Sequence, residues 1–371
     1  MLKPRIGGLI AAALISAYAS TALAQETLKV GALLPLTGPA APIGLEQQQG
    51  VQFAVDLANA QGGVNGKPIE LVLDDSQGKP DQAVLAFNRM ADLDQVPALI
   101  TAFSSISLAI APLATRREIL VMNPAAQTDK LADASEFLIN TIPLVNAESQ
   151  VMTKYAFEHI GKTASLLYEN AAAGIAGRDD FRNHFEALGG KVIAEEPVEF
   201  GQTNYRAALL KINASKPDFV YIAITQSHET MADQVGQIEG FPVAVGNTFS
   251  RPFFGYPSTE GWYQSAIQSN NPETRTLEAF KAKYGTKGMG FFAREYFNAT
   301  NIVIEAAKAL SAEGKELSGV NLRDTVLKIK TFKSPIAEIT FHTSTALRPV
   351  EIQQYVKGTR KVIEVATPVA Q

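Results

Sequence analysis

The chain of 371 residues contains no cysteine and only four histidines. Without cysteine there is no disulfide, no thiol nucleophile and no thiolate metal site. The histidines stand far apart, with no spacing that suits a shared metal ion, at positions His159, His184, His228 and His342. We therefore expect no metal site.

The motifs of common enzyme classes are also lacking. No serine stands in a G-x-S-x-G elbow. Gly161-Lys162-Thr163 looks like the end of a phosphate-binding loop, but Ala156 stands where that loop needs its first glycine. The adjacent Asp74 and Asp75 would point to opposite faces of a strand, which favours a structural role over paired acid–base chemistry. We therefore expect no bound cofactor, and the absence of a catalytic constellation argues against an enzyme.

The first 24 residues have the pattern of a secretory signal peptide. Lys3 and Arg5 precede an almost wholly apolar stretch, Ile6–Ala17, and Ala22-Leu23-Ala24 is an A-x-A cleavage site. No later run is long and apolar enough to span a bilayer, and no cysteine follows the signal to carry a lipid. The sequence thus predicts cleavage after Ala24, export to the periplasm and no insertion into the membrane. The net charge of −4 gives no support for a nucleic-acid partner.

Short apolar strands alternate with amphipathic helices in the first part of the chain. Strands are expected at Leu28–Leu34 and Ile69–Leu73, and Val51, Val55 and Ala58 lie on one face of the helix between them. Such alternation is typical of a parallel α/β sheet.

The same plan repeats further along. The strand Ala164–Tyr168 precedes a helix with Phe181 and Phe185 on one face, and Pro217–Ile224 corresponds to Pro97–Thr101. The chain is also longer than one core usually spans. The sequence therefore predicts two α/β lobes of the same plan.

Three expected helices near the carboxyl end interrupt this repeat: Pro272–Tyr284, Phe291–Leu310 and Leu322–Ile329. They most easily complete the first lobe, so the chain crosses between lobes near residues 145, 270 and 343. The predicted division gives residues 25–145 plus 270–342 to lobe 1 and residues 146–269 plus 343–371 to lobe 2.

Two polar loops follow neighbouring strands of lobe 1. Ala98–Thr101 ends in Phe103-Ser104-Ser105, and Leu120–Met122 ends in Asn123–Gln127. In an open parallel sheet both loops project from the edge where ligands bind. Ser104 or Ser105 can N-cap the next helix, whose free N–H groups suit a carboxylate. A capping role alone and a ligand-binding role both remain open at this point.

Several segments carry a resemblance to a known family: Val30–Gly38, Gln61–Gly66, Leu73–Ser76, Asn123–Ala126 and Glu295–Ala299. Together they resemble the periplasmic solute-binding proteins of ABC importers, in the branched-chain amino-acid (leucine-binding protein-like) family. The likeness covers essentially all of the chain after the signal. It implies a type I periplasmic binding protein, with two Rossmann-like lobes joined by a three-crossover hinge. It also implies that the lobes close on a small solute and deliver it to an inner-membrane ABC permease, and we expect a monomer.

The resemblance also implies ligand positions. The serine that receives the ligand carboxylate falls on Ser104, and the acid that holds the ligand ammonium falls near Asn247 and Thr248, within a stretch, 243–251, that has no Asp or Glu. The aromatic positions of the second lobe fall on Ala173 and near Thr225. The full set of expected ligand-binding residues is Phe103, Ser104, Ser105, Ala125, Gln127, Tyr168, Asn170, Ala173, Thr225, Asn247 and Thr248.

The loss of the acid matters because a buried ammonium without a negative partner is costly. The sequence therefore favours a carboxylate-bearing ligand without an amine, such as an aromatic acid. Three alternatives stay open. The ligand could be a branched-chain or other amino acid whose amine is held by Glu169, the protein could be a sensor of the same fold, or it could be a periplasmic enzyme.

Overall fold

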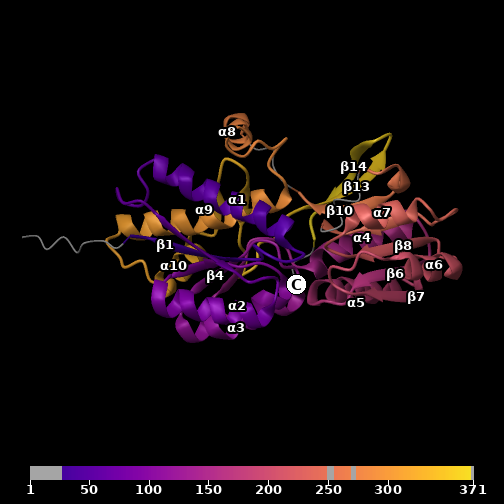
Figure 1. Ribbon diagram of the computed structural model, residues 1–371, viewed down its shortest axis with the longest axis horizontal. Coiled ribbons are helices and arrows are strands. Elements are labelled where there is room, and N and C mark those ends of the chain that lie inside the picture. Colours follow the sequence, from indigo (N-terminus) through magenta and orange to yellow (C-terminus); the bar gives the residue numbers. More distant parts are fainter. Residues whose placement is uncertain (1–26, 249–254, 269–272, 369–371) are drawn as a thin grey trace, which may run out of the picture.

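The computed structural model describes residues 27–248, 255–268 and 273–368. The predicted signal peptide and its cleavage site lie outside these residues, as do the last residues, 249–251, of the stretch in which the resemblance places the ammonium-holding acid. The described chain forms two lobes that lie side by side (Figure 1). Each helix in this part of the chain is too short or too polar to cross a membrane.

The sheet of the first lobe has five parallel strands in the order β2-β1-β3-β4-β5. Their bounds are β1 Lys29–Leu34, β2 Glu70–Asp75, β3 Ala98–Ile100, β4 Leu120–Asn123 and β5 Leu138–Asn140. Every residue of β3, β4 and β5 is buried. Helices cover both faces of such a sheet, which explains why its strands read as continuous apolar runs in the sequence.

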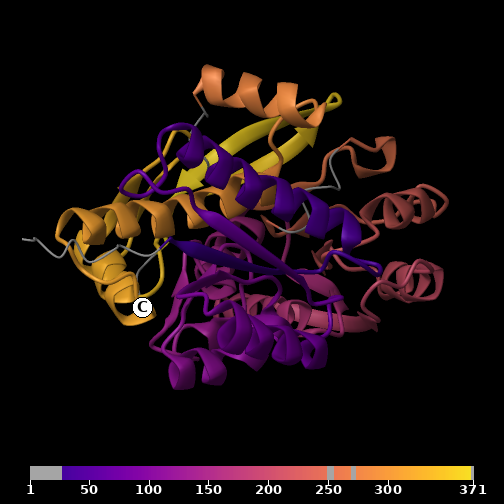
Figure 2. The same ribbon diagram turned by 60° about the vertical axis from the view of Figure 1, so that its left-hand side comes forward.

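Helices cover this sheet on both faces. Leu34 packs with α1, α9 and α10, whereas its neighbour Leu33 packs with α2 and α3, because adjacent strand residues point to opposite faces. Figure 2 shows α1 and α9 running alongside each other. The bounds are α1 Ala41–Ala60, α2 Pro80–Arg89, α3 Ser104–Arg117, α8 Thr274–Tyr284, α9 Phe291–Ala312 and α10 Gly319–Ile329. Residues of α9 and α10 belong to the core of the first lobe, while the assignment of the late helices to that lobe stays a prediction.

The second sheet repeats this order and extends it. Its strands β7-β6-β8-β9-β10 match β2-β1-β3-β4-β5, and the antiparallel strands β13 and β14 are added beyond β10. The strands are β6 Thr163–Glu169, β7 Lys191–Val198, β8 Phe219–Ala223, β9 Ala244–Gly246, β10 Tyr263–Ile267, β13 Val350–Val356 and β14 Thr359–Ala366. The helices are α4 Val145–His159, α5 Ala172–Ala187, α6 Arg206–Ser215 and α7 His228–Val235. The predicted repeat is confirmed.

The chain passes between the lobes three times: after β5, after β10 and before β13. Just before the third passage, a small hairpin, β11 Thr331–Lys333 and β12 Glu338–Thr340, packs on the core of the first lobe. The third passage then pairs with the end of β5, where the N–H of Asn140 donates to the carbonyl of Ser344 at 2.8 Å. The predicted two-lobe fold with a three-crossover hinge is confirmed, while the lobe boundaries near residues 145, 270 and 343 stay a prediction.

Candidate functional site

A small cavity, here called the inner cavity, lies between the two lobes. Its free volume is about 20 Å³, and it is lined by Gln47, Phe103, Ser104, Ala125, Ala126, Ala173, Thr225 and Phe292. Five of these are expected ligand-binding residues, contributed by loops of both lobes. The volume holds about one water molecule, so the lobes or the lining side chains must move apart to admit a solute.

The start of α3 forms one wall of the inner cavity. Ser104 is the first residue of α3 and is 3% exposed, at a helix end where backbone N–H groups lack helical partners. The prediction that Ser104 or Ser105 caps this helix is wrong: Phe103 is the N-cap residue, and no side chain caps the end. Among the described residues, the Ser104 hydroxyl accepts one long hydrogen bond, 3.4 Å, from the N–H of Thr128.

Phe103 holds an unusual backbone conformation, with φ 57° and ψ 145°. Residues with a side chain rarely adopt this region, and such strain is concentrated at functional sites. The Phe103 ring also meets the ring of Phe200, from the second lobe, edge to face at a centroid distance of 5.9 Å. The strained residue therefore both begins the wall at α3 and contacts the opposite lobe.

The loop after β4 forms a second wall, and Asn123 shapes it. The Oδ1 atom of Asn123 accepts from the N–H of Ala126 at 2.7 Å and from that of Ala125 at 3.3 Å. Its Nδ2 donates to Oδ1 of Asn140 on β5 at 2.7 Å. This turn holds both alanines against the inner cavity and leaves space beside them because their side chains are small.

Gln47 is a lining residue that we did not predict. It lies on α1, is fully buried, and neither Nε2 nor Oε1 has a hydrogen-bond partner among the described residues. Buried amides are nearly always paired, so one that faces a cavity points to a ligand or water as its partner. The sequence did carry a signal: Gln47 lies four residues before Val51, on the face of α1 that is otherwise apolar.

A buried carboxyl group lies directly behind the inner cavity in the second lobe. The Thr225 hydroxyl, which lines the cavity, donates to Oε2 of Glu169 at 2.5 Å. Glu169 is 2% exposed. Burial raises the pKa of Glu169 to about 7, although its hydrogen bonds from Thr225 act in the opposite direction. The carboxyl group therefore titrates much nearer to neutral pH than an exposed glutamate does.

Two of the expected residues, Gln127 and Thr248, bond to a second buried carboxylate, that of Glu148 on α4. Gln127 Nε2 donates to Glu148 Oε2 at 2.8 Å. Glu148 Oε1 accepts from the Thr248 N–H at 2.5 Å, from the Thr248 hydroxyl at 2.8 Å and from the Ser265 hydroxyl at 2.6 Å. The side chains of Gln127 and Thr248 are thus engaged within the protein, and their contact with a ligand stays a prediction.

The remaining expected residues do not line the inner cavity as the described residues define it. The Tyr168 hydroxyl accepts from Arg178 at 3.0 Å, and Asn170 donates to Glu199 at 3.3 Å. Ser105 is half-buried one position further along α3, and Asn247 bonds to the Tyr221 hydroxyl. For these four residues a role in binding also stays a prediction.

A larger cavity, here called the outer cavity, adjoins the inner one and shares Thr225 and Phe292 with it. Its volume is about 700 Å³, within the usual range for small-molecule sites. Its charged and titratable lining residues are Glu46 and Arg294 from the first lobe and His228 and Arg360 from the second. Burial lowers the pKa of His228 to about 4, so this side chain is neutral.

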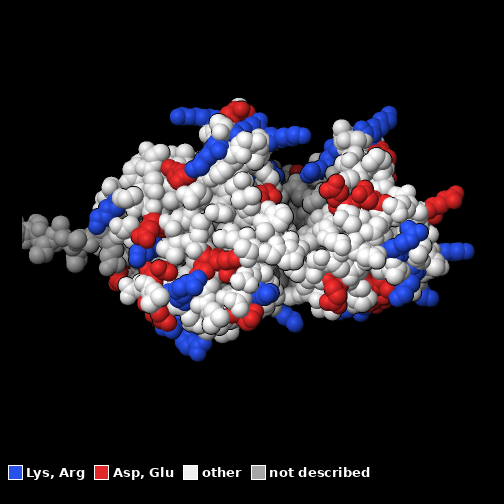
Figure 3. All heavy atoms as spheres, viewed as in Figure 1, with Lys and Arg blue, Asp and Glu red and all other residues white. Residues whose placement is uncertain are grey.

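The described residues contain no cluster of His, Asp and Glu that could hold a metal ion. On the face shown in Figure 3, acidic and basic side chains are interspersed over both lobes. Neither a metal cluster among the described residues nor a patch of one charge on this face marks a binding site. The candidate site is therefore defined by the two adjoining cavities between the lobes and by the polar groups that line them.

Comparisons with known proteins agree with this geometry. The family model described as periplasmic binding protein matches residues 27–360. A leucine-, isoleucine-, valine-, threonine- and alanine-binding protein from Pseudomonas aeruginosa is 27% identical over 366 residues, covering 95% of each chain. The structure of this chain also superposes on two solved structures, and the sequence of each is 21% identical to this one. One is LivJ of Streptococcus pneumoniae with isoleucine (TM-score 0.80; 92% of this chain and 100% of that one). The other is an ABC transporter solute-binding protein of R. palustris with benzoate (TM-score 0.82; 93% and 98%).

The family match covers nearly all of the described chain, and the two-lobe fold agrees with it. This family consists of transport proteins and not of enzymes. Membership therefore decides against the periplasmic enzyme, the last of the three alternatives that the sequence left open. The chain belongs to the periplasmic binding proteins, in the leucine-binding protein-like branch that serves ABC transporters.

Proposed function

We propose that the protein captures a small carboxylic acid without an amine, of which an aromatic acid is the favoured kind, and delivers it to an inner-membrane ABC permease. The observation that carries the proposal is the lining of the inner cavity. Its polar residues are Gln47, Ser104 and Thr225, and no lining residue among those described is charged. An ammonium group there would lack a negative partner, which is costly in a closed site.

The same lining suits a carboxylate attached to a ring. The Ser104 hydroxyl, the free N–H groups at the start of α3 and the Gln47 amide can all donate to a carboxylate. Phe103 and Phe292 offer aromatic faces and edges for a ring. The R. palustris protein that holds benzoate has the same fold, which supports the proposal.

An amino acid is the second candidate, and Glu169 is the reason. Its carboxyl group lies one hydrogen bond behind the cavity wall, with the Thr225 hydroxyl between. If that hydroxyl turned away, an ionised Glu169 could hold a ligand ammonium. The relative from Pseudomonas aeruginosa is named for branched-chain and other small amino acids, which favours this candidate.

Calorimetry and thermal unfolding with benzoate, 4-hydroxybenzoate and leucine separate the two candidates. We expect the aromatic acids to bind and to stabilise the folded protein, by about 2.7 kcal/mol at a ligand concentration one hundred times Kd. Leucine should bind weakly or not at all. Glu169→Gln should barely change binding of the aromatic acids. Tight leucine binding that Glu169→Gln abolishes would overturn the proposal and establish the amino-acid candidate.

Replacing Ser104 by alanine tests the proposed carboxylate contact. We expect Ser104→Ala to weaken benzoate binding by about 1–3 kcal/mol, as the loss of a hydrogen bond to a charged group does. The fold should survive, because the hydroxyl makes one long hydrogen bond, and no other, within the part of the chain that the structure describes. Ser311→Ala is the matched control and should leave the affinity unchanged, since the Ser311 hydroxyl has no hydrogen-bond partner among the described residues and lines neither cavity. Full affinity in Ser104→Ala would place the carboxylate elsewhere.

A further inference from the structure

The outer cavity brings two arginines together from opposite lobes. Arg294 is the fourth residue of α9, in the first lobe. Arg360 is the second residue of β14, in the second lobe. Burial lowers the pKa of the Arg294 guanidinium group. Arg360 is exposed, and the charge of Arg294 lies near enough to act on it. Like charges that face each other across a cleft repel, and an anion between them would remove that repulsion.

Two hydrogen-bond donors at this cavity have no partner among the described residues. They are Nε of Arg294 and Nε2 of Gln226, and both atoms are buried. Buried donors of this kind are rare in native structures and call for a partner. The charges of the lining also favour an anion, because two arginines stand against the single acid Glu46.

The two cavities adjoin, since Thr225 and Phe292 line both. A solute with one carboxylate at Ser104 can therefore extend into the outer cavity once the lobes or these side chains move apart to admit it. A group of the solute in the outer cavity would meet the guanidinium groups of Arg294 and Arg360 and the amide donor of Gln226. Guanidinium groups bind carboxylates with strong, often paired hydrogen bonds.

We propose that the outer cavity is a subsite for a second acidic group of the solute, held between Arg294 and Arg360, so that the preferred solute is a dicarboxylate. The proposal rests on the proposed function, because it takes the first carboxylate to lie in the inner cavity. It adds a role for each lobe: the second acidic group contacts one arginine from each and so favours the closed form.

Calorimetry with benzoate and terephthalate, which differ by one carboxylate, tests this subsite. We expect the wild type to bind terephthalate about tenfold or more tightly than benzoate, as a charge-assisted hydrogen bond would provide. In Arg360→Gln the ratio of the two affinities should fall about tenfold. Arg360 is exposed, so its replacement should not impair folding.

Lys361→Gln is the matched control. It removes the same charge from the neighbouring residue of β14, whose side chain points to the opposite face of the sheet. It should leave both affinities and their ratio unchanged. An equal fall of the ratio in Lys361→Gln would indicate a general charge effect and overturn the subsite.

The possible failures are distinguishable. Benzoate binding without a preference for terephthalate, or a preference that survives Arg360→Gln, would overturn the subsite and leave the proposed function intact. Binding of neither acid would overturn the proposed function and the subsite with it.

Discussion

Replacing Arg348 by methionine should lower the free energy of unfolding by about 3–5 kcal/mol. Arg348 lies in the third passage between the lobes, and its Nη1 donates to Oε2 of Glu295 on α9 at 2.6 Å. The side chains of this ion pair are 5% and 1% exposed. Removing the arginine leaves the Glu295 charge buried without its partner, which is the main cause of the expected loss.

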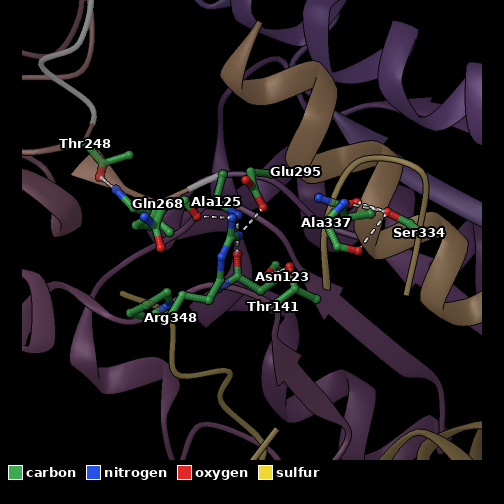
Figure 4. A network of polar contacts seen from close by, with 12 residues as sticks. Asn123, Ala125, Thr141, Thr248, Gln268, Glu295, Ser334, Ala337 and Arg348 are labelled. Atoms are coloured by element: carbon green, nitrogen blue, oxygen red, sulfur yellow. Dashed lines mark hydrogen bonds and ion pairs between the residues drawn. The ribbon is translucent and has the colours of Figure 1, made fainter. Parts of the chain in front are cut away.

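The same guanidinium also joins two of the passages between the lobes. Its Nη2 donates to the carbonyl of Gln268, in the second passage, at 2.9 Å, and Figure 4 shows Arg348 reaching between Gln268 and Glu295. Arg348→Met therefore removes the contact that joins the second and third passages to the first lobe. It also leaves the buried charge of Glu295 without its partner.

Chemical denaturation followed by circular dichroism measures the effect. Arg117→Met is a suitable control, because it removes an arginine from an ion pair with Asp92 whose side chains are 42% and 50% exposed. Exposed pairs contribute about 1 kcal/mol or less. The double variant Arg348→Met with Glu295→Leu should recover much of the loss, since no buried charge then remains. A cost below about 1 kcal/mol in Arg348→Met would contradict this account.

The two-lobe fold could be predicted from the sequence because most of its strands are buried by helices on both faces and read as apolar runs. The elements that escaped prediction were those without such a pattern. β5 and β9 have three residues each, too few to show a period. β3 is equally short, but the polar loop Phe103-Ser104-Ser105 marks its end in the sequence. On α4 the buried face includes Glu148, Ser149 and Thr153, so polar residues hide its helical period.

The candidate site was predictable where one strand end supplies a loop, as at Ser104, Ala125 and Thr225. Phe292, Arg294 and Arg360 were not, because they come from α9 and β14, which the chain brings to the cleft only after its later passages between the lobes. No local motif marks such residues. Gln47 is the intermediate case: its position on the buried face of α1 could be read from the helical spacing, but its unpaired amide could not.

The second large effect is expected at Glu148. This carboxylate is fully buried and accepts hydrogen bonds from the Gln127 amide, from the backbone and hydroxyl of Thr248, and from the Ser265 hydroxyl. Glu148→Leu would leave these buried donors without an acceptor, and each unsatisfied group costs about 1–3 kcal/mol, though not additively. We expect the free energy of unfolding to fall by about 3 kcal/mol or more.

Glu148→Gln distinguishes the loss of the acceptor from the loss of the charge. Its amide oxygen can still accept from Thr248 and Ser265, and its NH₂ group would face the NH₂ group of Gln127. The Gln127 amide can resolve that conflict by turning over, because its Oε1 has no hydrogen-bond partner among the described residues, but it would then lose the 3.3 Å hydrogen bond from Nε2 to the Pro143 carbonyl. We therefore expect Glu148→Gln to cost about 1 kcal/mol, the ordinary value of one hydrogen bond.

The matched control is Glu158→Leu, the same substitution at an exposed position of α4, which should stay within about 0.5 kcal/mol of the wild type. Urea denaturation of the three variants gives the order directly. If Glu148→Gln costs as much as Glu148→Leu, the negative charge itself is what the buried donors require. If Glu148→Leu costs no more than Glu158→Leu, the four hydrogen bonds contribute nothing net, and Glu148 does not hold Gln127 and Thr248 in place.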